Sequence, residues 1–319
     1  MKIMRFIGIV FALFSAGSPS DTSAQDSGKK YKVYMVSNSH LDTRWRWDVK
    51  ATIDDYLYNT AVQNLALLEK YPHYVFNFEG AVKYEWIKEY YPHLFERIRK
   101  FVADGRWNIS GASFEANDPN MPSSESFIRN ILLAQEFYKK EFGIKSKDMF
   151  LPDCFGFSQV MPTLGHHCGL IGFSTQKLSW RTEPLVGDSK TPFPIGLGEG
   201  VDGARIMVAL EPGRYSWNEF PEGDLSANEE LAESARKSPF GIAYRYYGNK
   251  LANGAGDHGG SALPRSIQLL EEGITNGKGP VQLVSATSSQ LYEDYMPYGN
   301  HPELPVFVGE MPLDVHAPG

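Results

Sequence analysis

The chain has 319 residues, of which 42% are hydrophobic and 22% are charged, and its formal net charge is −7. This composition predicts a globular protein with enough apolar side chains for a sizeable core, in one large α/β domain or two smaller ones. The negative charge argues against a nucleic-acid or anionic-membrane surface, because clustered Lys and Arg are needed to bind phosphate groups. We therefore expect a neutral ligand and no nucleic-acid partner, and the oligomeric state is left open.

Residues 1–24 have the layout of a secretory signal peptide. Lys2 and Arg5 precede the apolar run Phe6–Phe14, and small residues follow as far as Ala24. The alternative, a membrane anchor, needs roughly 20 apolar residues to span a bilayer, and this run is shorter. We expect a cleaved signal peptide, export to the periplasm or the extracellular space, and no membrane span in the mature chain.

Strands and helices are expected to alternate along the rest of the chain. The predicted strands are Tyr31–Ser39, Tyr74–Phe78, Trp107–Ser110, Asp148–Leu151, Ile171–Thr175 and Ala204–Leu210. The predicted helices are Ile53–Tyr71, Val82–Asp104, Ser123–Phe142, Pro162–Gly169, Ala227–Lys237 and Ser261–Glu272. This alternation favours parallel strands with right-handed crossovers. We predict an α/β fold with a parallel or barrel-like sheet and helices around it.

Other segments are expected to be irregular. Residues Thr182–Gly203 are dense in Gly and Pro and predict a long loop. After the apolar run Leu304–Val308 no closing helix or strand is expected, so the domain is predicted to stop before it is complete. Cys154 and Cys168 are the two cysteines, and nothing in their spacing shows that they form a disulfide.

Two acidic motifs follow predicted strands. Because residues i and i+2 of an extended segment point to the same side, His40 and Asp42 can bind one cation. Asp153 follows a later strand, and the carboxyl ends of parallel strands lie together, so Asp153 can face the same crevice. Taken singly, a strand-end hydrogen bond between His40 and Asp42 and a helix N-cap at Asp153 remain open alternatives.

Together with several other motifs, these residues resemble family 38 glycoside hydrolases, the zinc-dependent retaining α-mannosidases. The resemblance covers nearly all of residues 31–319. Its motifs are His40-Leu41-Asp42 with Trp45, Gly105-Arg106-Trp107, Glu115 with Asn120–Ser126, Leu151–Gly156, Pro162, Thr175–Leu178 and Val201–Gly203. The resemblance implies that residues 25–319 form an α/β catalytic domain that hydrolyses terminal α-linked mannose in glycans.

The resemblance also implies a role for each matched residue. His40, Asp42 and Asp153 would bind Zn²⁺, and Asp153 would also be the nucleophile, whose ionised form the metal favours. A retaining mechanism further needs an acid/base carboxyl about 5 to 5.5 Å from the nucleophile. Asp314, in a late acidic segment, is the candidate for this role, and Glu310 is the alternative.

Four further residues are candidates for substrate contacts. Trp45 could stack on a sugar face, because an aromatic ring offers a flat apolar surface. Glu79 and Glu115 could bind sugar hydroxyl groups, and Lys177 follows a predicted strand. An ordinary hydrogen-bonding role remains open for each polar residue of this set.

Two departures from the family pattern limit what the resemblance implies. The family takes a further metal ligand, a His, from beyond the matching region, and neither His301 nor His316 lies in a segment that corresponds to it. The family also follows this domain with a helical bundle and β-sandwich domains. Two alternatives therefore stay open: a metal-dependent hydrolase similar to polysaccharide deacetylases, and an inactive carbohydrate-binding fragment. Whether the chain is active alone is also open.

Overall fold

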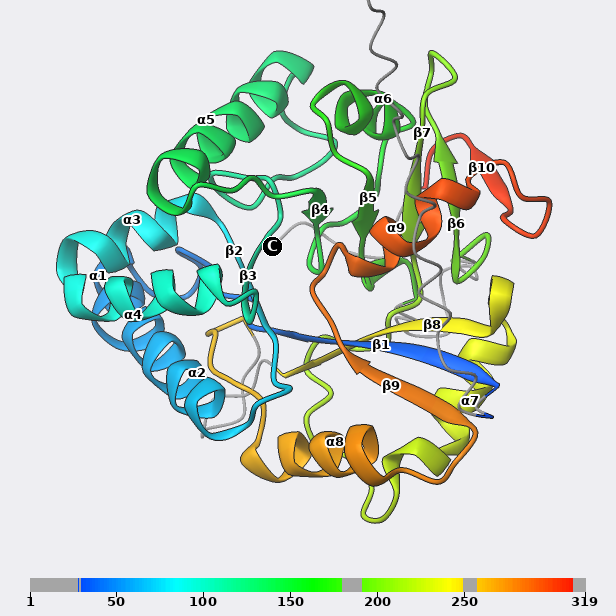
Figure 1. The fold of residues 1–319 in the computed structure, drawn as a ribbon. Helices are drawn as coiled ribbons and strands as arrows, with labels where there is room; N and C mark the ends of the chain where they lie inside the picture. The colour runs from blue at the N-terminus through cyan, green and yellow to red at the C-terminus, as the bar shows by residue number, and fades with distance from the viewer. Residues whose placement is uncertain (1–27, 29, 180–190, 249–256, 312–319) are drawn as a thin grey trace, which may run out of the picture.

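The computed structural model describes residue 28 and residues 30–179, 191–248 and 257–311, and these form two sheets with helices around them (Figure 1). The predicted signal peptide lies outside the described residues. Within them, no helix combines the length and the apolar character that crossing a lipid bilayer requires. The α/β prediction is confirmed.

The strands form one parallel sheet and one mixed sheet. The first sheet has the order β3-β2-β1-β8, with β9 also paired to β1. Its strands are β1 (Tyr31–Asn38), β2 (Phe76–Glu79), β3 (Trp107–Ser110), β8 (Ile242–Gly248) and β9 (Val281–Ser285). The second sheet has the order β10-β6-β7-β5-β4. Its strands are β4 (Asp148–Phe150), β5 (Gly172–Ser174), β6 (Ile195–Glu199), β7 (Arg205–Ala209) and β10 (Val306–Val308).

The helices lie mainly on the outer faces of the sheets (Figure 1). They are α1 (Val49–Ala51), the π-helix η1 (Thr52–Leu57), α2 (Tyr58–Lys70), α3 (Ala81–Tyr90), α4 (Pro92–Ala103), α5 (Ser124–Phe142), α6 (Val160–His167), α7 (Glu229–Arg236), α8 (Pro264–Asn276) and α9 (Gln290–Tyr295). Short 3₁₀ helices are η2 (Lys177–Ser179), η3 (Leu225–Ala227), η4 (Pro239–Gly241) and η5 (Met296–Tyr298).

Strand β1 is buried on both faces, because its side chains alternate between two cores. Val33 and Met35 pack with the inner faces of the helices α2 to α5, α7 and α8. Tyr34 and Val36 belong to a second core, which both sheets share. A strand covered on both sides needs apolar side chains at successive positions, which is the pattern of its sequence.

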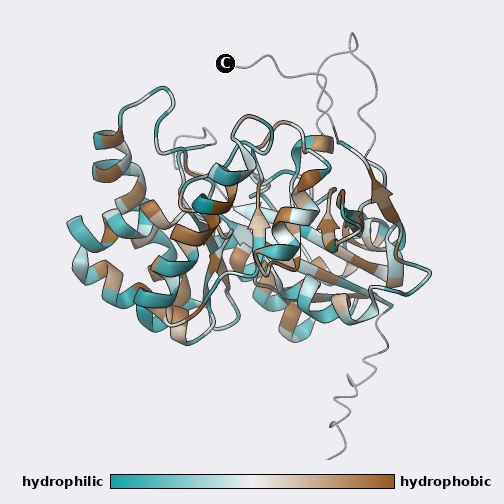
Figure 2. Ribbon diagram, turned by 90° about the horizontal axis from the view of Figure 1, so that it is seen from above, coloured by the Kyte–Doolittle hydropathy of each residue, from teal (hydrophilic) through white to brown (hydrophobic). Residues whose placement is uncertain are grey.

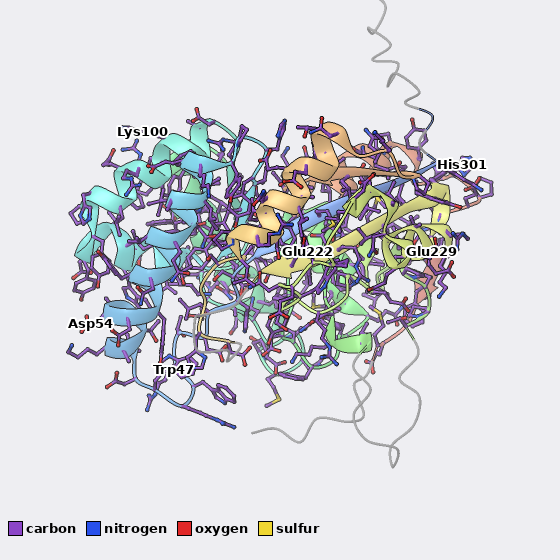
Figure 3. All side chains as sticks on the ribbon, turned by 90° about the horizontal axis from the view of Figure 1, so that it is seen from below. Trp47, Asp54, Lys100, Glu222, Glu229 and His301 are labelled. Carbon is purple, nitrogen blue, oxygen red and sulfur yellow. The ribbon has the colours of Figure 1, made fainter. Side chains whose placement is uncertain are left out.

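The outer helices are amphipathic, with hydrophobic and hydrophilic stripes along their surfaces (Figure 2). In α4, for example, Leu94, Phe95 and Ile98 are buried against the first sheet. Charged side chains such as Lys100 and Glu229 lie at the periphery (Figure 3). Burial of the apolar stripes therefore holds the helices against the sheets.

The segment Val82–Asp104, predicted as one helix, is two. Helix α3 ends at Tyr90, and α4 begins with Pro92 in its first turn. Tyr91 between them has a non-helical backbone (φ −134°, ψ 57°), because the ring of a following proline disfavours helical geometry in the preceding residue. The hydrophobic spacing on both sides of the break is helical, so periodicity alone could not reveal it.

The prediction of a loop over Thr182–Gly203 is also wrong in part. Residues 182–190 lie outside the described residues, but β6 occupies Ile195–Glu199 and pairs antiparallel with β7, against the parallel expectation. Glycine is required within this strand, since a Cβ atom on Gly196 would lie 2.4 Å from the Phe193 ring. The glycines that indicated a loop instead permit close packing.

The carboxyl ends of β1, β2, β4, β5 and β8 supply the loops from which the candidate site is built.

Strand β4 begins with a carboxyl group, that of Asp148, whose effect on stability can be tested. Asp148, at the start of β4, is buried, and its Oδ1 accepts hydrogen bonds from the Gly111 N–H and the Ser146 hydroxyl, both at 3.3 Å. Burial raises the pKa of Asp148 to about 6 from its ordinary value of 3.8.

We expect Asp148→Asn to stabilise the protein at neutral pH. A carboxyl whose pKa is raised on folding contributes stability below its unfolded pKa, and this contribution is lost as pH rises through the folded pKa. The variant should exceed the original chain in unfolding free energy by at most about 3 kcal/mol at pH 7.5, with little difference at pH 3.5. Urea unfolding at both pH values measures this. An equal difference at the two pH values would show that ionisation of Asp148 is not the cause.

Candidate active site

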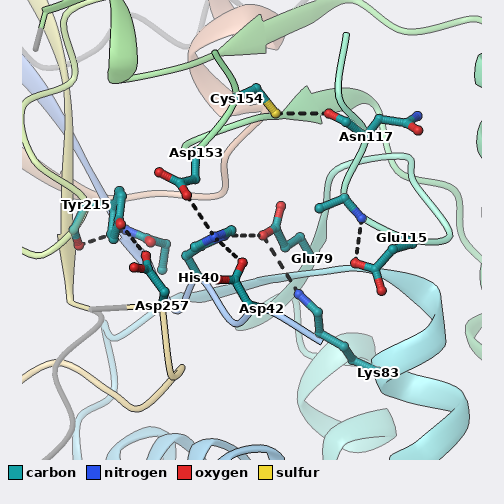
Figure 4. Close-up of polar contacts among 12 residues, drawn as sticks. His40, Asp42, Glu79, Lys83, Glu115, Asn117, Asp153, Cys154, Tyr215 and Asp257 are labelled. Carbon is teal, nitrogen blue, oxygen red and sulfur yellow. Dashed lines mark hydrogen bonds and ion pairs between the residues drawn. The ribbon is translucent and has the colours of Figure 1, made fainter. Parts of the chain in front are cut away.

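Three potential metal ligands meet at the carboxyl ends of the strands. His40 and Asp42 follow β1, and Asp153 follows β4 (Figure 4). His40 Nε2 lies 3.2 Å from Asp42 Oδ1 and 3.7 Å from Asp153 Oδ2. One ligand atom from each of the three residues lies within 4.8 Å of the other two. Two segments far apart in the sequence thus contribute to one cluster, as the strand-end argument predicts.

The imidazole of His40 is held in one orientation by a buried carboxylate. His40 Nδ1 lies 2.8 Å from Glu79 Oε1, at the end of β2, and the side chains of both residues are 5% exposed. Lys83 Nζ, on α3, is 3.8 Å from the same Glu79 oxygen. When Nδ1–H donates to Glu79, Nε2 keeps its lone pair directed at Asp42 and Asp153. This is the arrangement in which carboxylates commonly orient metal-binding histidines.

The donor atoms fit a divalent metal. Nε2 of His40 is buried and makes no hydrogen bond of ordinary geometry within the described part of the chain, although two carboxylates lie near it. One imidazole and two carboxylates are a usual ligand set for a metal ion that keeps open positions for other ligands. The residues therefore fit the metal that the sequence predicts.

The protonation of His40 links metal binding to pH. Burial disfavours the charged imidazolium, but the carboxylates of Asp42, Glu79 and Asp153 outweigh it and raise the pKa of His40 well above its usual range. A metal ion has to replace the proton on Nε2, so metal affinity should rise with pH.

Asp153 is also held from its other side. Lys177 follows β5, is almost fully buried, and its ammonium group forms an ion pair with Asp153 Oδ1, whereas Oδ2 faces His40. The same ammonium group lies 4.7 Å from the centre of the Phe155 ring. The two oxygens of Asp153 therefore have different surroundings: Oδ1 lies beside the Lys177 ammonium group, and Oδ2 belongs to the cluster of potential metal ligands.

A cavity of about 220 Å³ opens beside the cluster. It is lined by His40, Asp42, Glu79, Ala116, Asn117, Asp118, Phe150, Leu151, Pro152, Asp153, Cys154 and Phe155. Cys154 is a free thiol whose Sγ donates to the Asn117 carbonyl at 3.0 Å, and burial raises its pKa well above the usual range. The thiol is therefore neutral, and the polar lining that remains is rich in carboxylates.

The structure places the other predicted site residues differently. Glu79 lines the cavity, but its carboxylate already contacts His40. Glu115 is turned to its own loop, where it accepts from the Ala116 N–H at 2.7 Å. Glu310 is exposed, and none of the described contacts joins it to Asp153; Asp314 lies outside the described residues. Their predicted roles remain predictions.

The two tryptophans of the loop after β1 differ in their environment. Trp45 is 50% exposed, and the Arg46 guanidinium lies 4.3 Å from its ring centre. Trp47 donates to the Thr52 hydroxyl at 2.9 Å and stacks on His258 at 4.1 Å between ring centres. Trp45 is exposed on this loop, whereas Trp47 connects the loop to the π-helix and to a later loop.

Two residues beside the cluster, Tyr215 and Asp257, are not among the predicted site residues. Tyr215 has its ring centre 5.6 Å from that of His40, and its hydroxyl hydrogen-bonds Asp257 Oδ1 (Figure 4). Asp257 belongs to the loop after β8, a strand that was not predicted. The aromatic run Ile242–Gly248, followed by a Gly-rich segment around an acidic residue, was the available signal.

Comparisons with known proteins identify the family of this domain. Residues 30–310 match the family described as glycosyl hydrolases family 38 N-terminal domain. Alpha-mannosidase G from Dictyostelium discoideum is 30% identical over 297 residues, which are 92% of this chain and 26% of that protein. Alpha-mannosidase 2C1 from Homo sapiens is 30% identical over 289 residues, 90% of this chain and 26% of that protein. The chain thus spans about a quarter of the length of these relatives.

A solved structure has the same fold. An alpha-mannosidase from Enterococcus faecalis V583 superimposes with a TM-score of 0.70 at 23% identity. The match covers 88% of this chain and 31% of the other. It confirms the architecture that the sequence predicts.

We expect the purified protein to bind about one equivalent of a divalent metal and His40→Ala to lose it, because Nε2 supplies the buried nitrogen ligand. After dialysis against equal concentrations of Mn²⁺, Co²⁺ and Zn²⁺, elemental analysis gives the stoichiometry. His167→Ala is the matched control, since this exposed histidine pairs with Asp202 outside the cluster. Equal metal content in the original chain and His40→Ala would rule out this site.

Glu79→Gln should weaken metal binding without abolishing it. The amide can still occupy the space beside His40, but it cannot provide the negative charge that makes the imidazole a better ligand. Loss of such a partner typically costs about 10- to 100-fold in metal affinity. Competition with a chromophoric chelator measures the change, and an affinity within about threefold of the original would assign Glu79 no role in metal binding.

Proposed function

The chain belongs to glycosyl hydrolase family 38 through its N-terminal domain, and on this premise we propose that the protein hydrolyses terminal α-linked mannose in glycans with retention of configuration. The convergence of His40, Asp42 and Asp153 beside a cavity is the observation that supports the proposal most directly. Because the named relatives are alpha-mannosidases of much greater length, the activity is proposed for the whole protein.

Zinc is the metal that suits the proposed site. His40, Asp42 and Asp153 would hold it, and their nitrogen and oxygen donors match its preference. When bound, zinc would supply a positive charge that attracts sugar hydroxyl groups and favours ionised carboxylates. Within the protein, Glu79 keeps the Nδ1 proton of His40 in place, so Nε2 is left free for coordination.

Asp153 is proposed as the nucleophile. Its carboxylate attacks the anomeric carbon, the bond to the leaving oxygen breaks, and a glycosyl-enzyme ester forms on Asp153. Lys177 holds one carboxylate oxygen by an ion pair, which orients the group. Water then attacks the same anomeric carbon and releases the sugar with its original configuration.

The acid/base role needs a second carboxyl group near the nucleophile. Asp257 is the described residue that we propose for it, since Tyr215 packs against His40 and its hydroxyl group donates a hydrogen bond to Asp257 Oδ1. No described contact joins Glu310 to Asp153, and Asp314 lies outside the described residues. Asp257 would give its proton to the leaving oxygen in the first step and take one from water in the second.

The remaining parts of the proposal concern substrate and location. Trp45 is exposed on the loop after β1 and would stack on a sugar ring. Several carboxylates line the cavity, which agrees with a neutral sugar and not an anionic one. Residues 1–24 would direct the protein out of the cytoplasm.

Asp153→Asn should lower the hydrolysis of 4-nitrophenyl α-mannoside by at least about 10³-fold, because the amide is a poor nucleophile and a weaker metal ligand. The initial rate of 4-nitrophenol release measures the loss, with zinc present in excess. Asp202→Asn is the control, since Asp202 is exposed and contacts His167 and Thr163 away from the cavity.

Two results would contradict the proposal. Hydrolysis by Asp153→Asn at the original rate would remove this residue from the mechanism. Release of acetate from acetylated polysaccharides, with no release of mannose from mannosides, would instead identify a deacetylase.

A further inference from the structure

Tyr215 is anchored at the point where the carboxyl ends of the two sheets meet. Its N–H donates to Gln176 Oε1 at 2.9 Å, and its carbonyl accepts from Asn38 Nδ2 at 3.4 Å. Asn38 ends β1 in the first sheet, and Gln176 follows β5 in the second. Both side chains are buried. The backbone of Tyr215 is therefore fixed to both sheets by groups that cannot turn to solvent.

The side chain of Tyr215 has equally little freedom. It is 5% exposed, and its ring packs at a tilt of 57° against the His40 imidazole. Its phenolic O–H donates to Asp257 Oδ1. Packing against His40 therefore fixes the orientation of the Tyr215 ring, and the hydroxyl group of this ring contacts Asp257, the proposed acid/base residue.

Asp257 depends on partners outside its own loop. Its backbone has φ +69°, a left-handed conformation that is rare for residues other than glycine. The loop is tied to β1, because the Asp257 carbonyl accepts from the Asp42 N–H and the Gly259 N–H donates to the His40 carbonyl, both at 2.9 Å. These bonds fix the position of the Asp257 backbone, and in the part of the chain that the structure describes the Tyr215 hydroxyl group is the hydrogen-bond partner of its carboxyl group.

We infer that Tyr215 is a positioning residue for proton transfer: its hydroxyl holds Asp257 Oδ1 so that the other carboxyl oxygen faces the leaving group. The inference rests on the proposed function and deepens it. In the first step the proton on that oxygen passes to the glycosidic oxygen as its bond to the anomeric carbon breaks and the bond to Asp153 forms. Water returns a proton to Asp257 in the second step, so atoms and charges balance.

The test compares two substrates with Tyr215→Phe in the zinc-loaded protein. A mannobiose has a leaving alcohol that needs a proton, whereas 2,4-dinitrophenyl α-mannoside has a leaving group that departs without one. We expect kcat/KM to fall about 10- to 100-fold on the mannobiose, part of the 10²- to 10⁴-fold that a positioned acid supplies. On the dinitrophenyl substrate it should change less than about threefold.

Tyr244→Phe serves as the matched control. Tyr244 is also buried, and its hydroxyl donates to the Ser288 carbonyl at 2.9 Å in the core shared by the sheets. Its loss should affect both substrates equally. Equal losses on both substrates for Tyr215→Phe would overturn the inference in favour of a structural role, and so would unchanged rates on both.

Asp257→Asn separates the inference from the function on which it rests. If this variant shows no leaving-group dependence while Asp153→Asn is inactive, Asp257 is not the acid, and the inference is overturned although the glycosidase activity stands. If Asp257→Asn loses more of its rate on the mannobiose than on the dinitrophenyl substrate, adding Tyr215→Phe to this variant should cause no further loss on the mannobiose. An independent further loss there would overturn the inference, because residues that act through one group are not additive.

Discussion

Parallel pairing on both edges of β1 is the constraint on which the rest of the structure depends. Residues 32–38 of this strand pair with β8 along one edge, and the opposite edge pairs with β9 near the start and with β2 near the end. Since both faces are also buried, β1 cannot shift or turn without exposing one of two cores. His40 and Asp42 therefore leave the sheet at a fixed point, close to the ends of its neighbours.

Contacts with later loops hold the residues that follow β1 in a fixed position at the site. The loop after β8 hydrogen-bonds both residues that flank Leu41, and the bond from Gly259 requires a glycine. Gly259 has φ +74°, and a Cβ atom there would lie 2.3 Å from the Thr60 hydroxyl oxygen. Glu79 and Lys177 then hold His40 and Asp153, respectively. These two proposed ligands are thus each held by a buried group that follows or ends a different strand, which favours a preorganised site.

Sequence patterns predicted the parts of the site in which chemistry and local periodicity coincide. His40, Asp42 and Asp153 could be placed together because each follows an apolar strand, and parallel strands bring their carboxyl ends to one edge. Asp257 could not, because β8 interrupts its apolar run with Arg245 and is followed by a Gly-rich segment. The break before Pro92 and the glycine-containing β6 were missed for different reasons. The proline acts on the residue directly before it, and the helical hydrophobic period continues across this break. The glycines of β6 allow close packing, which local periodicity does not report.

The pairing of β1 also sets the order in which the protein can be assembled. Synthesis yields β1 early, but its partners β8 and β9 come near the end of the described chain. Until then the edge of β1 that pairs with β8 has unpaired peptide groups. Such a high contact order slows folding and prolongs the exposure of an aggregation-prone segment. The cluster of His40, Asp42 and Asp153 can therefore reach its final arrangement only after β8 and β9 have been synthesised.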